Sequence, residues 1–116
     1  QPFYENTTIV ISGDHLTMQS DFFNLEEGQD YEKKVVNLII NPAVEPQNTN
    51  RRYSTFDLYP TTLASLGAEI EGDRLALGTN LFSNEETLIE KYGLECVNDE
   101  LMKTSKFYNN NILVAK

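Results

Sequence analysis

The sequence predicts an α/β fold with a mostly parallel sheet, and three observations lead to this prediction. Two short runs rich in β-branched and aliphatic residues, 7–12 (TTIVIS) and 34–41 (KVVNLIIN), have the pattern of strands covered on both faces. About twenty residues separate the runs, enough for a crossover between parallel strands. From Asp57 the pattern becomes helical. We therefore expect both runs in one sheet, with helices elsewhere in the chain.

The first predicted helix follows Asp57. This residue can cap a helix, Pro60 falls in the first turn, where amide hydrogens lack partners, and Gly67 can end it. The alternative role for Asp57 is a third carboxylate of a metal site, but a cap accounts for both the aspartate and the tolerated proline. The helical spacing predicts an inner face of Leu58, Thr62, Leu63 and Leu66.

Two further helices are expected towards the C-terminus. Ser83 and Glu86 have the spacing of a capping box, and Gly93 can end the helix that follows. Asn98 can cap a last helix, which is followed by a turn at 109–111 and a final strand or extended tail at 112–115.

The remaining segments are predicted as connections. A short helical turn is expected at 18–24, followed by a polar loop at 26–30. Residues 43–50 lack periodicity and read as a surface loop. The glycine-punctuated stretch 69–81 is expected to be loop with at most one brief extended segment.

Composition and charge limit the possible functions. With 116 residues, 40% hydrophobic and 23% charged, the chain has the size and composition of one small globular domain. The formal net charge of −9 argues against binding to nucleic acid and to an anionic membrane surface. The single cysteine, Cys96, cannot form an internal disulfide, and no apolar run reaches the about 20 residues of a membrane span.

The chain is expected to be a fragment of a larger protein. Gln1 stands a few residues before a strand of the buried type, which is an unusual place for a natural protein to begin. We therefore expect residues 1–116 to form a single piece of a larger domain.

Gly13-Asp14-His15 is the most suggestive motif, because it follows the first predicted strand directly. Open α/β sheets place their ligands at the carboxyl ends of strands. A carboxylate and an imidazole side by side on a tight turn can bind one divalent ion, and Gly13 eases the turn. Taken alone, such a triplet is more often a turn in which the aspartate caps the backbone than a metal site.

Longer stretches around this triplet resemble a known family. The runs NTTIVISGDHLTM and NRRYSTFDLYPTTLASLGAEIEGDRLALGTNLFS are similar to the phosphoglycerol transferases that modify osmoregulated glucans and, more distantly, to the lipoteichoic acid synthases. Both groups belong to the alkaline phosphatase/sulfatase superfamily. The resemblance extends from Asn6 to about Tyr108, and its most specific parts are GDH, DLYPT (57–61) and LGTNLFS (77–83). It implies the C-terminal part of a three-layer sandwich with a mostly parallel sheet.

The resemblance implies that Asp14 and His15 are metal ligands, with manganese as the expected ion and zinc, magnesium or calcium as alternatives. In the family, the nucleophilic threonine and an acidic ligand lie well upstream of GDH, so this chain is expected to hold no catalytic nucleophile. The parent enzyme would transfer glycerophosphate from a phospholipid headgroup, through the threonine, to a glycan or polymer acceptor. It would act on the extracytoplasmic face of a bacterial membrane.

Two arginines and several aromatic residues are secondary candidates. Arg51 and Arg52 can bind a phosphate or headgroup through their forked donors, or form surface ion pairs instead. Tyr53 and its aromatic neighbours are better explained as loop anchors or core residues than as platforms for sugar stacking.

Two other interpretations of the chain stay open. A sulfatase or a phosphoethanolamine transferase of the same superfamily shares GDH and differs in nucleophile and substrate pocket, so the upstream sequence would separate these from a phosphoglycerol transferase. A structural or binding module without catalysis fits the missing nucleophile. It fits poorly with a strand of the buried type so near the start of the chain, since such a strand would keep unpaired edges.

Overall fold

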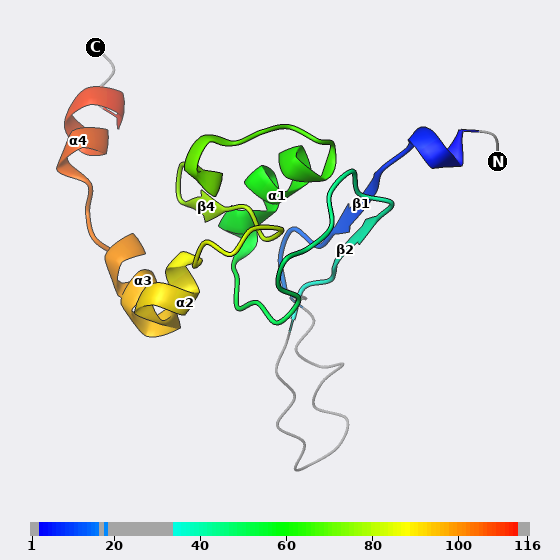
Figure 1. Cartoon of the computed structure of the whole chain (residues 1–116). Coiled ribbons are helices and arrows are strands. Elements are labelled where there is room, and N and C mark those ends of the chain that lie inside the picture. Colours follow the sequence, from blue (N-terminus) through cyan, green and yellow to red (C-terminus); the bar gives the residue numbers. More distant parts are fainter. Residues whose placement is uncertain (1–2, 17, 19–33, 114–116) are drawn as a thin grey trace.

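The computed structural model describes residues 3–16, 18 and 34–113 as a mixed α/β structure with two small antiparallel sheets (Figure 1). The α/β class is therefore confirmed, whereas the parallel direction of the strands is not. Apart from Met18, the predictions for 18–24 and 26–30 lie outside the described residues. Within the described part of the chain, no helix is long and apolar enough to cross a membrane.

The first sheet joins the two apolar runs. Strands β1 (Ile9–Ser12) and β2 (Asn37–Ile40) follow a short 3-10 helix, η1 (Tyr4–Asn6), and pair in register from Ile9 opposite Ile40 to Ser12 opposite Asn37. Both strands were predicted to lie in one sheet, and they do. The strands run antiparallel, which corrects the prediction of parallel strands. A connection that is long enough for a crossover between parallel strands can also join two antiparallel neighbours.

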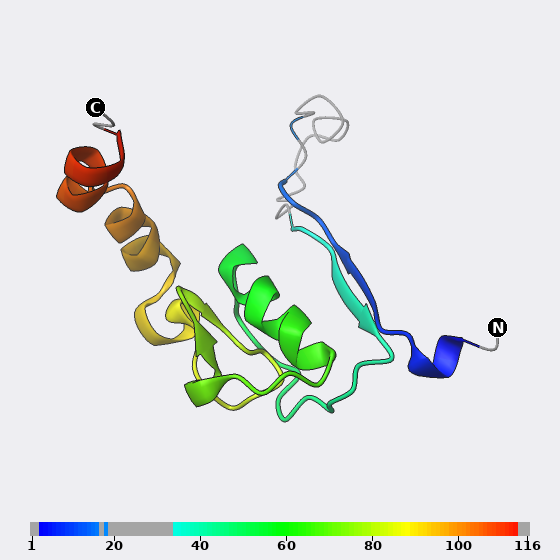
Figure 2. The ribbon, with the colours of Figure 1, turned by 90° about the horizontal axis from the view of Figure 1, so that it is seen from above.

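Helix α1 (Leu58–Ser65) lies between this hairpin and the rest of the molecule (Figure 2). It follows the 3-10 helix η3 (Thr55–Asp57) and ends at Gly67, as predicted. Gly67 takes a φ of 85° and donates its N–H to the carbonyl of Ala64 at 2.9 Å. The N–H of Ala68 donates to Leu63 at 3.1 Å, which completes a Schellman motif.

The buried face of α1 differs from the predicted one. The leucine-rich face is only partly covered, and Leu66 is 61% exposed. Small and polar side chains are buried instead. Among them, the Thr61 hydroxyl donates to the carbonyl of Asp57 and accepts the N–H of Leu81, and no hydrophobic pattern indicates such contacts. The buried residues of the helix are Pro60, Thr61, Ala64 and Ser65.

Two connecting segments agree with the sequence in general character. Residues 43–50 contain neither helix nor strand, as predicted. The stretch 69–81 forms the 3-10 helix η4 (Glu71–Asp73) and two brief strands rather than at most one, β3 (Arg74–Leu75) and β4 (Gly78–Thr79). These strands pair as a second antiparallel hairpin.

The N-cap of helix α2 (Leu88–Tyr92) is Thr87, and not Ser83 as the sequence predicted. The Thr87 hydroxyl accepts the N–H of Glu90 at 3.1 Å, and the Glu90 carboxylate accepts the N–H of Thr87 at 2.9 Å. This is a capping box four residues after the predicted one. Ser83 instead donates its hydroxyl to the carbonyl of Asn80 at 2.8 Å.

The last predicted helix begins earlier in the chain than the sequence indicated. Gly93 ends α2 as predicted, but it also precedes α3 (Leu94–Leu101), so Asn98 lies within a helix rather than at its cap. A short helix α4 (Lys106–Tyr108) continues into a π-helical turn at Asn109–Leu113. The prediction of extended chain at 112–115 is therefore wrong for residues 112 and 113, and the other two lie outside the described residues.

The centre of the described structure is polar, and Asp57 is its main junction. This carboxylate is 1% exposed; Oδ1 accepts the N–H of Thr79 at 2.8 Å, and Oδ2 accepts the N–H of Ser54 at 2.8 Å. Asp57 holds the N-cap position of α1, as predicted, but its side chain makes no capping hydrogen bond there. The carboxylate instead completes a capping box with Ser54, the N-cap residue of η3. It thereby ties β4 to the segment before α1.

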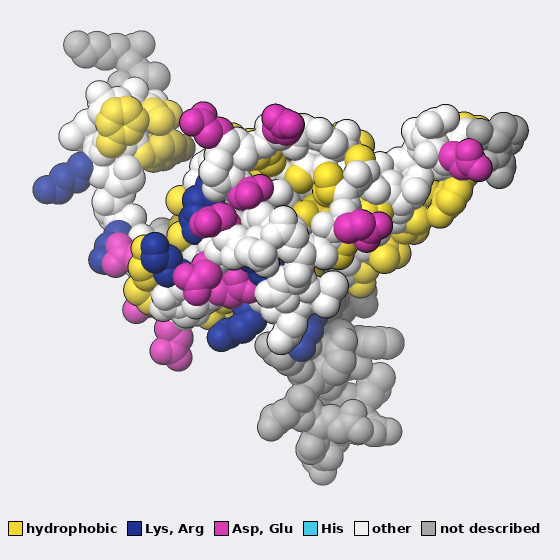
Figure 3. Space-filling model, in the orientation of Figure 1, with side chains coloured by type: hydrophobic (Ala, Val, Ile, Leu, Met, Phe, Trp, Pro, Cys, Tyr) yellow, Lys and Arg dark blue, Asp and Glu magenta, His cyan; other side chains and the backbone are white. Residues whose placement is uncertain are grey.

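Large apolar side chains are exposed around this polar centre. On the first hairpin, Ile9 is 38%, Ile11 is 49% and Leu38 is 47% exposed. Hydrophobic side chains are visible along that arm and at the α4 end in Figure 3. In the described residues, the apolar side chains that are buried are Pro60, Ala64, Ile89 and Val97.

The close approach of β4 to α1 predicts that Gly78→Ala is strongly destabilising. A Cβ on Gly78 would lie 2.1 Å from the carbonyl oxygen of Phe56 and 3.0 Å from Cδ of Pro60, so backbone must move. We expect a loss of about 3 kcal/mol or more in the free energy of unfolding. Urea titration followed by circular dichroism measures this change.

Gly72→Ala is the matched control for that substitution. Gly72 has a φ of 66°, and no atom of the described residues lies within 4 Å of an added Cβ. It should lose only about 1 kcal/mol, from backbone conformation alone. Equal losses for the two variants would contradict the close-packing argument.

Candidate metal-binding site

Asp14 and His15 lie at the carboxyl end of β1, as the sequence predicted. The N–H of Gly13 donates to the carbonyl of Val36 at 2.8 Å and so extends the hairpin by one hydrogen bond. A Cβ on Gly13 would lie 3.3 Å from Cβ of Val35, so a larger residue would crowd the neighbouring strand. The hairpin therefore fixes the position from which the two side chains project.

The two candidate ligand atoms are close enough to share one ion. Oδ1 of Asp14 and Nε2 of His15 are 3.7 Å apart, with the side chains 91% and 61% exposed. Metal–oxygen and metal–nitrogen bonds of about 2.1 Å span up to about 4.2 Å between two ligand atoms. The mixed oxygen and nitrogen donor pair fits Mn²⁺ or Zn²⁺ better than Mg²⁺ or Ca²⁺, which prefer oxygen alone.

The other ring nitrogen of His15 already has a partner. Nδ1 lies 2.7 Å from the carbonyl oxygen of Leu16, to which a protonated Nδ1 donates. The neutral imidazole then carries its lone pair on Nε2, the nitrogen that faces Asp14. A backbone carbonyl that fixes the histidine tautomer is the usual support of a metal-ligating imidazole.

The pair is not a complete metal site by itself. Across the described ranges, no group of three or more His, Cys, Asp or Glu residues is placed to hold an ion. Asp57, the alternative third carboxylate, uses both of its oxygens for backbone amides and a hydroxyl of the chain. Asp21 lies outside the described residues.

The Arg51 side chain has a structural role, because it is hydrogen-bonded within the fold. Its side chain is 5% exposed, and Nε and Nη2 each donate to the Glu90 carboxylate at 2.9 Å. Nη1 donates to the carbonyl of Ser83 at 2.6 Å, and Nη2 also donates to the carbonyl of Glu85. With a longer contact to Leu81 at 3.5 Å, all five N–H groups have acceptors. None is left for a phosphate in this arrangement.

Arg52 differs from its neighbour. Its backbone is fixed, because its N–H donates to Glu90 at 3.0 Å and its carbonyl accepts the Thr87 hydroxyl at 2.5 Å. The residue is exposed, and its guanidinium has no hydrogen bond or ion pair with the part of the chain that the structure describes. The structure therefore separates the two adjacent arginines: one is buried in a network and the other is accessible.

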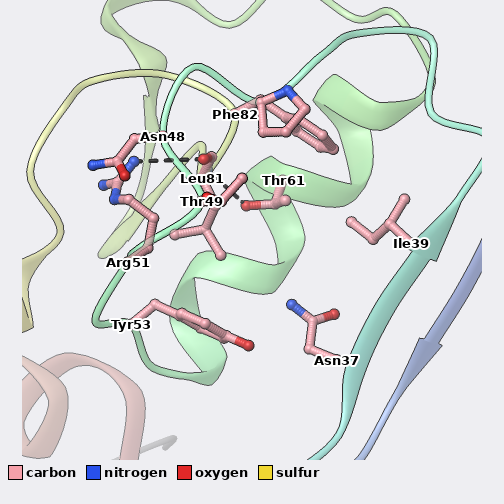
Figure 4. A pocket seen from close by; sticks show the side chains of 10 residues that line it. Asn37, Ile39, Asn48, Thr49, Arg51, Tyr53, Thr61, Leu81 and Phe82 are labelled. Atoms are coloured by element: carbon pink, nitrogen blue, oxygen red, sulfur yellow. Dashed lines mark hydrogen bonds between the residues drawn. The ribbon is translucent and has the colours of Figure 1, made fainter.

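Sequence reasoning missed a cavity of about 210 Å³ between β2 and the loop that leads to Tyr53 (Figure 4). Asn37 lines it from β2, opposite Ser12 and therefore two residues from Asp14. One signal could have indicated it: Asn37 is the polar residue inside the apolar run 34–41. A polar residue in a strand of the buried type requires a partner.

Comparison with known proteins does not place the chain: no family model, no curated protein and no solved structure matches it.

The Arg51–Glu90 pair predicts a specific dependence of stability on pH. The hydrogen bond from Arg51, assisted by backbone N–H groups of Thr87 and Arg52, lowers the pKa of Glu90 from 4.5 to about 2, although burial opposes this. Because the folded pKa is the lower one, the stabilisation is fully present above pH 4.5 and is lost as pH falls towards 2. It amounts to at most about 3 kcal/mol.

Glu90→Gln should therefore lower the free energy of unfolding at pH 7 and remove this part of the acid dependence. Urea titrations at several pH values between 2 and 7 measure both effects. Glu95→Gln, on exposed α3, is the control and should keep the wild-type profile. A profile of Glu90→Gln parallel to wild type would show that the ion pair does not stabilise the fold.

Proposed function

We propose that this chain is the C-terminal part of the catalytic domain of a metal-dependent phosphoglycerol transferase, in which Asp14 and His15 are metal ligands. The observation that supports this most directly is the 3.7 Å separation of Oδ1 and Nε2 at the end of β1, with Nδ1 of His15 already bonded to a backbone carbonyl. The resemblance of the motif supports the family, and the distance between the two atoms supports their role as a ligand pair.

The proposal extends to the fold of the parent domain. A two-stranded hairpin is at best marginally stable alone, and here its apolar residues are exposed. We propose that β1 and β2 complete a larger, mostly parallel sheet of a three-layer sandwich, with the remaining catalytic domain as partner. The antiparallel pairing is compatible with this, since many otherwise parallel sheets carry an antiparallel edge strand.

The proposed chemistry divides between this chain and the rest of the enzyme. The ion, Mn²⁺ in the first instance, would lower the pKa of the nucleophilic hydroxyl and stabilise charge at phosphorus. Asp14 and His15 would hold the ion at the carboxyl end of β1, where their exposed side chains are accessible to further ligands from other segments. The nucleophilic threonine would come from the upstream part of the domain.

The proposed substrates are a phospholipid headgroup as donor and a glycan or polymer hydroxyl as acceptor, on the extracytoplasmic side of a bacterial membrane. Arg52 is the better of the two arginines for a phosphate contact, because its guanidinium is accessible while that of Arg51 is used within the fold. A single exposed arginine would orient the donor but would not supply most of the donor's binding free energy.

Metal affinity tests the ligand assignment. Two ligands on one exposed turn must order that turn with only two bonds, so we expect the chain to bind Mn²⁺ or Zn²⁺ with a Kd of about 0.1 mM or weaker. Asp14→Ala and His15→Ala should each abolish this binding in a calorimetric titration and leave the circular dichroism spectrum unchanged.

Asp99→Ala on α3 is the control for that titration, because it removes an exposed carboxylate of the same type away from the hairpin. Binding unaffected by either ligand substitution would contradict the assignment. Micromolar binding would mean that further ligands exist within the chain, and Asp21 would be the first to substitute.

Catalysis is expected only in the parent protein. The 116-residue chain should show no metal-dependent hydrolysis of chromogenic phosphodiesters, phosphate monoesters or sulfate esters above the buffer rate, because it holds no nucleophile. In the parent, His15→Ala should abolish glycerophosphate transfer. Full transfer by that variant would remove the basis of the functional assignment.

A further inference from the structure

The charges of the chain are unevenly distributed, and its C-terminal end is opposite in sign to the rest. All 18 Asp and Glu residues lie within 1–100. Residues 101–116 contain no carboxylate side chain and three of the nine Lys and Arg residues, Lys103, Lys106 and Lys116. The net charge of −9 therefore describes the body of the chain and not its end. An anionic partner that the body would repel can approach this end.

Residues 101–113, the C-terminal segment, expose large apolar side chains. None of these residues is buried, and Asn109 alone is half-buried. In Figures 1 and 2 the α4 end lies apart from α1 and from both sheets. The described part of the chain thus leaves this apolar surface uncovered. Its large apolar residues are at least 46% exposed, and they are Leu101, Met102, Phe107, Tyr108, Ile112 and Leu113.

The helical form of this segment gathers its apolar side chains. The N–H of Tyr108 donates to the Ser105 hydroxyl at 3.1 Å, which caps α4 locally. In the π-helical turn that follows α4, hydrogen bonds reach five residues along the chain, so residues five positions apart lie near one another. This spacing matches Phe107 with Ile112 and Tyr108 with Leu113. Figure 3 shows hydrophobic side chains gathered at the α4 end.

Lysines alternate with these apolar residues along the segment. Lys103 follows Met102 and forms an ion pair with Glu100 of α3. Lys106 precedes Phe107 and forms no ion pair with the described residues. A lysine can lay its methylene stem along an apolar surface while its ammonium group stays in water. At a bilayer surface, ammonium groups therefore reach lipid phosphates while neighbouring apolar side chains enter the boundary between headgroups and acyl chains.

The outward face of the first hairpin differs from this segment in chemistry. Its cross-strand pairs are aliphatic: Ile9 lies opposite Ile40, and Ile11 lies opposite Leu38. Residues directly opposite each other point to the same face, and neither strand contains a charged residue. Such a face fits the interior of a protein. The C-terminal segment would carry lysines into an interior at a high desolvation cost, so it fits a lipid surface better.

We infer that the C-terminal segment binds the surface of a bilayer that contains anionic phospholipids. Phe107 and Tyr108 lie at the boundary between headgroups and acyl chains, and Lys103 and Lys106 contact lipid phosphates. The segment lies on the bilayer, since no described helix is long and apolar enough to cross one. The acidic body of the chain stays on the aqueous side. Binding of this kind requires neither the metal ligands nor the proposed transfer reaction.

Co-sedimentation of the 116-residue chain with lipid vesicles tests the inference. The chain should bind vesicles of phosphatidylserine and phosphatidylcholine in equal amounts, and about tenfold more weakly vesicles of phosphatidylcholine alone. Phosphatidylserine supplies negative charge without a glycerol headgroup, so the vesicles probe a charged surface and not a donor site. Raising the salt concentration from about 0.1 M to about 1 M should release much of the bound chain, because salt screens the lysines.

Three variants and two matched controls assign the binding to the segment. Lys103→Gln and Lys106→Gln should each weaken vesicle binding about fivefold, and Phe107→Ser should weaken it about tenfold or more. Because these side chains are exposed, the circular dichroism spectrum should stay unchanged. Lys91→Gln on α2 and Tyr59→Ser on α1 remove side chains of the same kinds, both exposed, and should bind as wild type does.

The contrary outcomes are distinct from failure of the proposed function. No binding to the mixed vesicles, equal binding to both vesicle types, or binding that the three variants leave unchanged would overturn the lipid assignment. A dimer in sedimentation velocity that Phe107→Ser dissociates would also overturn it, since a second copy would then cover the segment. The metal titration of Asp14 and His15 is unaffected by any of these results, so the two proposals fail separately.

Discussion

The described structure depends first on the buried carboxylate of Asp57. It accepts hydrogen bonds from Ser54 on one side and from the N–H of Thr79 on the other, so it joins the start of α1 to β4 across 22 residues of sequence. Thr61, one helical turn later, adds a second link by accepting the N–H of Leu81 at 3.0 Å. Because these groups are buried and paired, losing any one leaves an unsatisfied partner in a nearly dry environment.

A second polar junction, between Arg51 and Glu90, fixes the loop that forms one wall of the cavity. The guanidinium links that loop to Glu90 of α2 and to backbone carbonyls of the 81–85 segment, so the loop is held against these two segments. This explains why an arginine that could bind phosphate does not face solvent, while Arg52 does. It also explains how a segment without helix or strand can present Tyr53 at a defined position.

Asp14, His15 and Asn37 lie at the same end of the first hairpin. Asp14 and His15 leave β1 just after Ser12, and Asn37 enters β2 opposite that residue. In the proposed function, the exposed apolar residues of the hairpin would form the surface on which the rest of a catalytic domain completes the sheet.

Features that depend on neighbouring residues could be predicted from the sequence, whereas contacts between distant segments could not. The two strands, the stops at Gly67 and Gly93 and the position of Asp14 and His15 after β1 depend on residues adjacent in the chain, and the sequence alone determined them. The tertiary structure decided the antiparallel pairing, the polar face of α1, the use of Asp57 and Arg51 within the fold, and the cavity around Asn37. The physical reason is that burial and hydrogen-bond partners come from segments 20 to 40 residues away, as with Thr61 and Leu81 or Arg51 and Glu90, and no local pattern specifies which segments will meet.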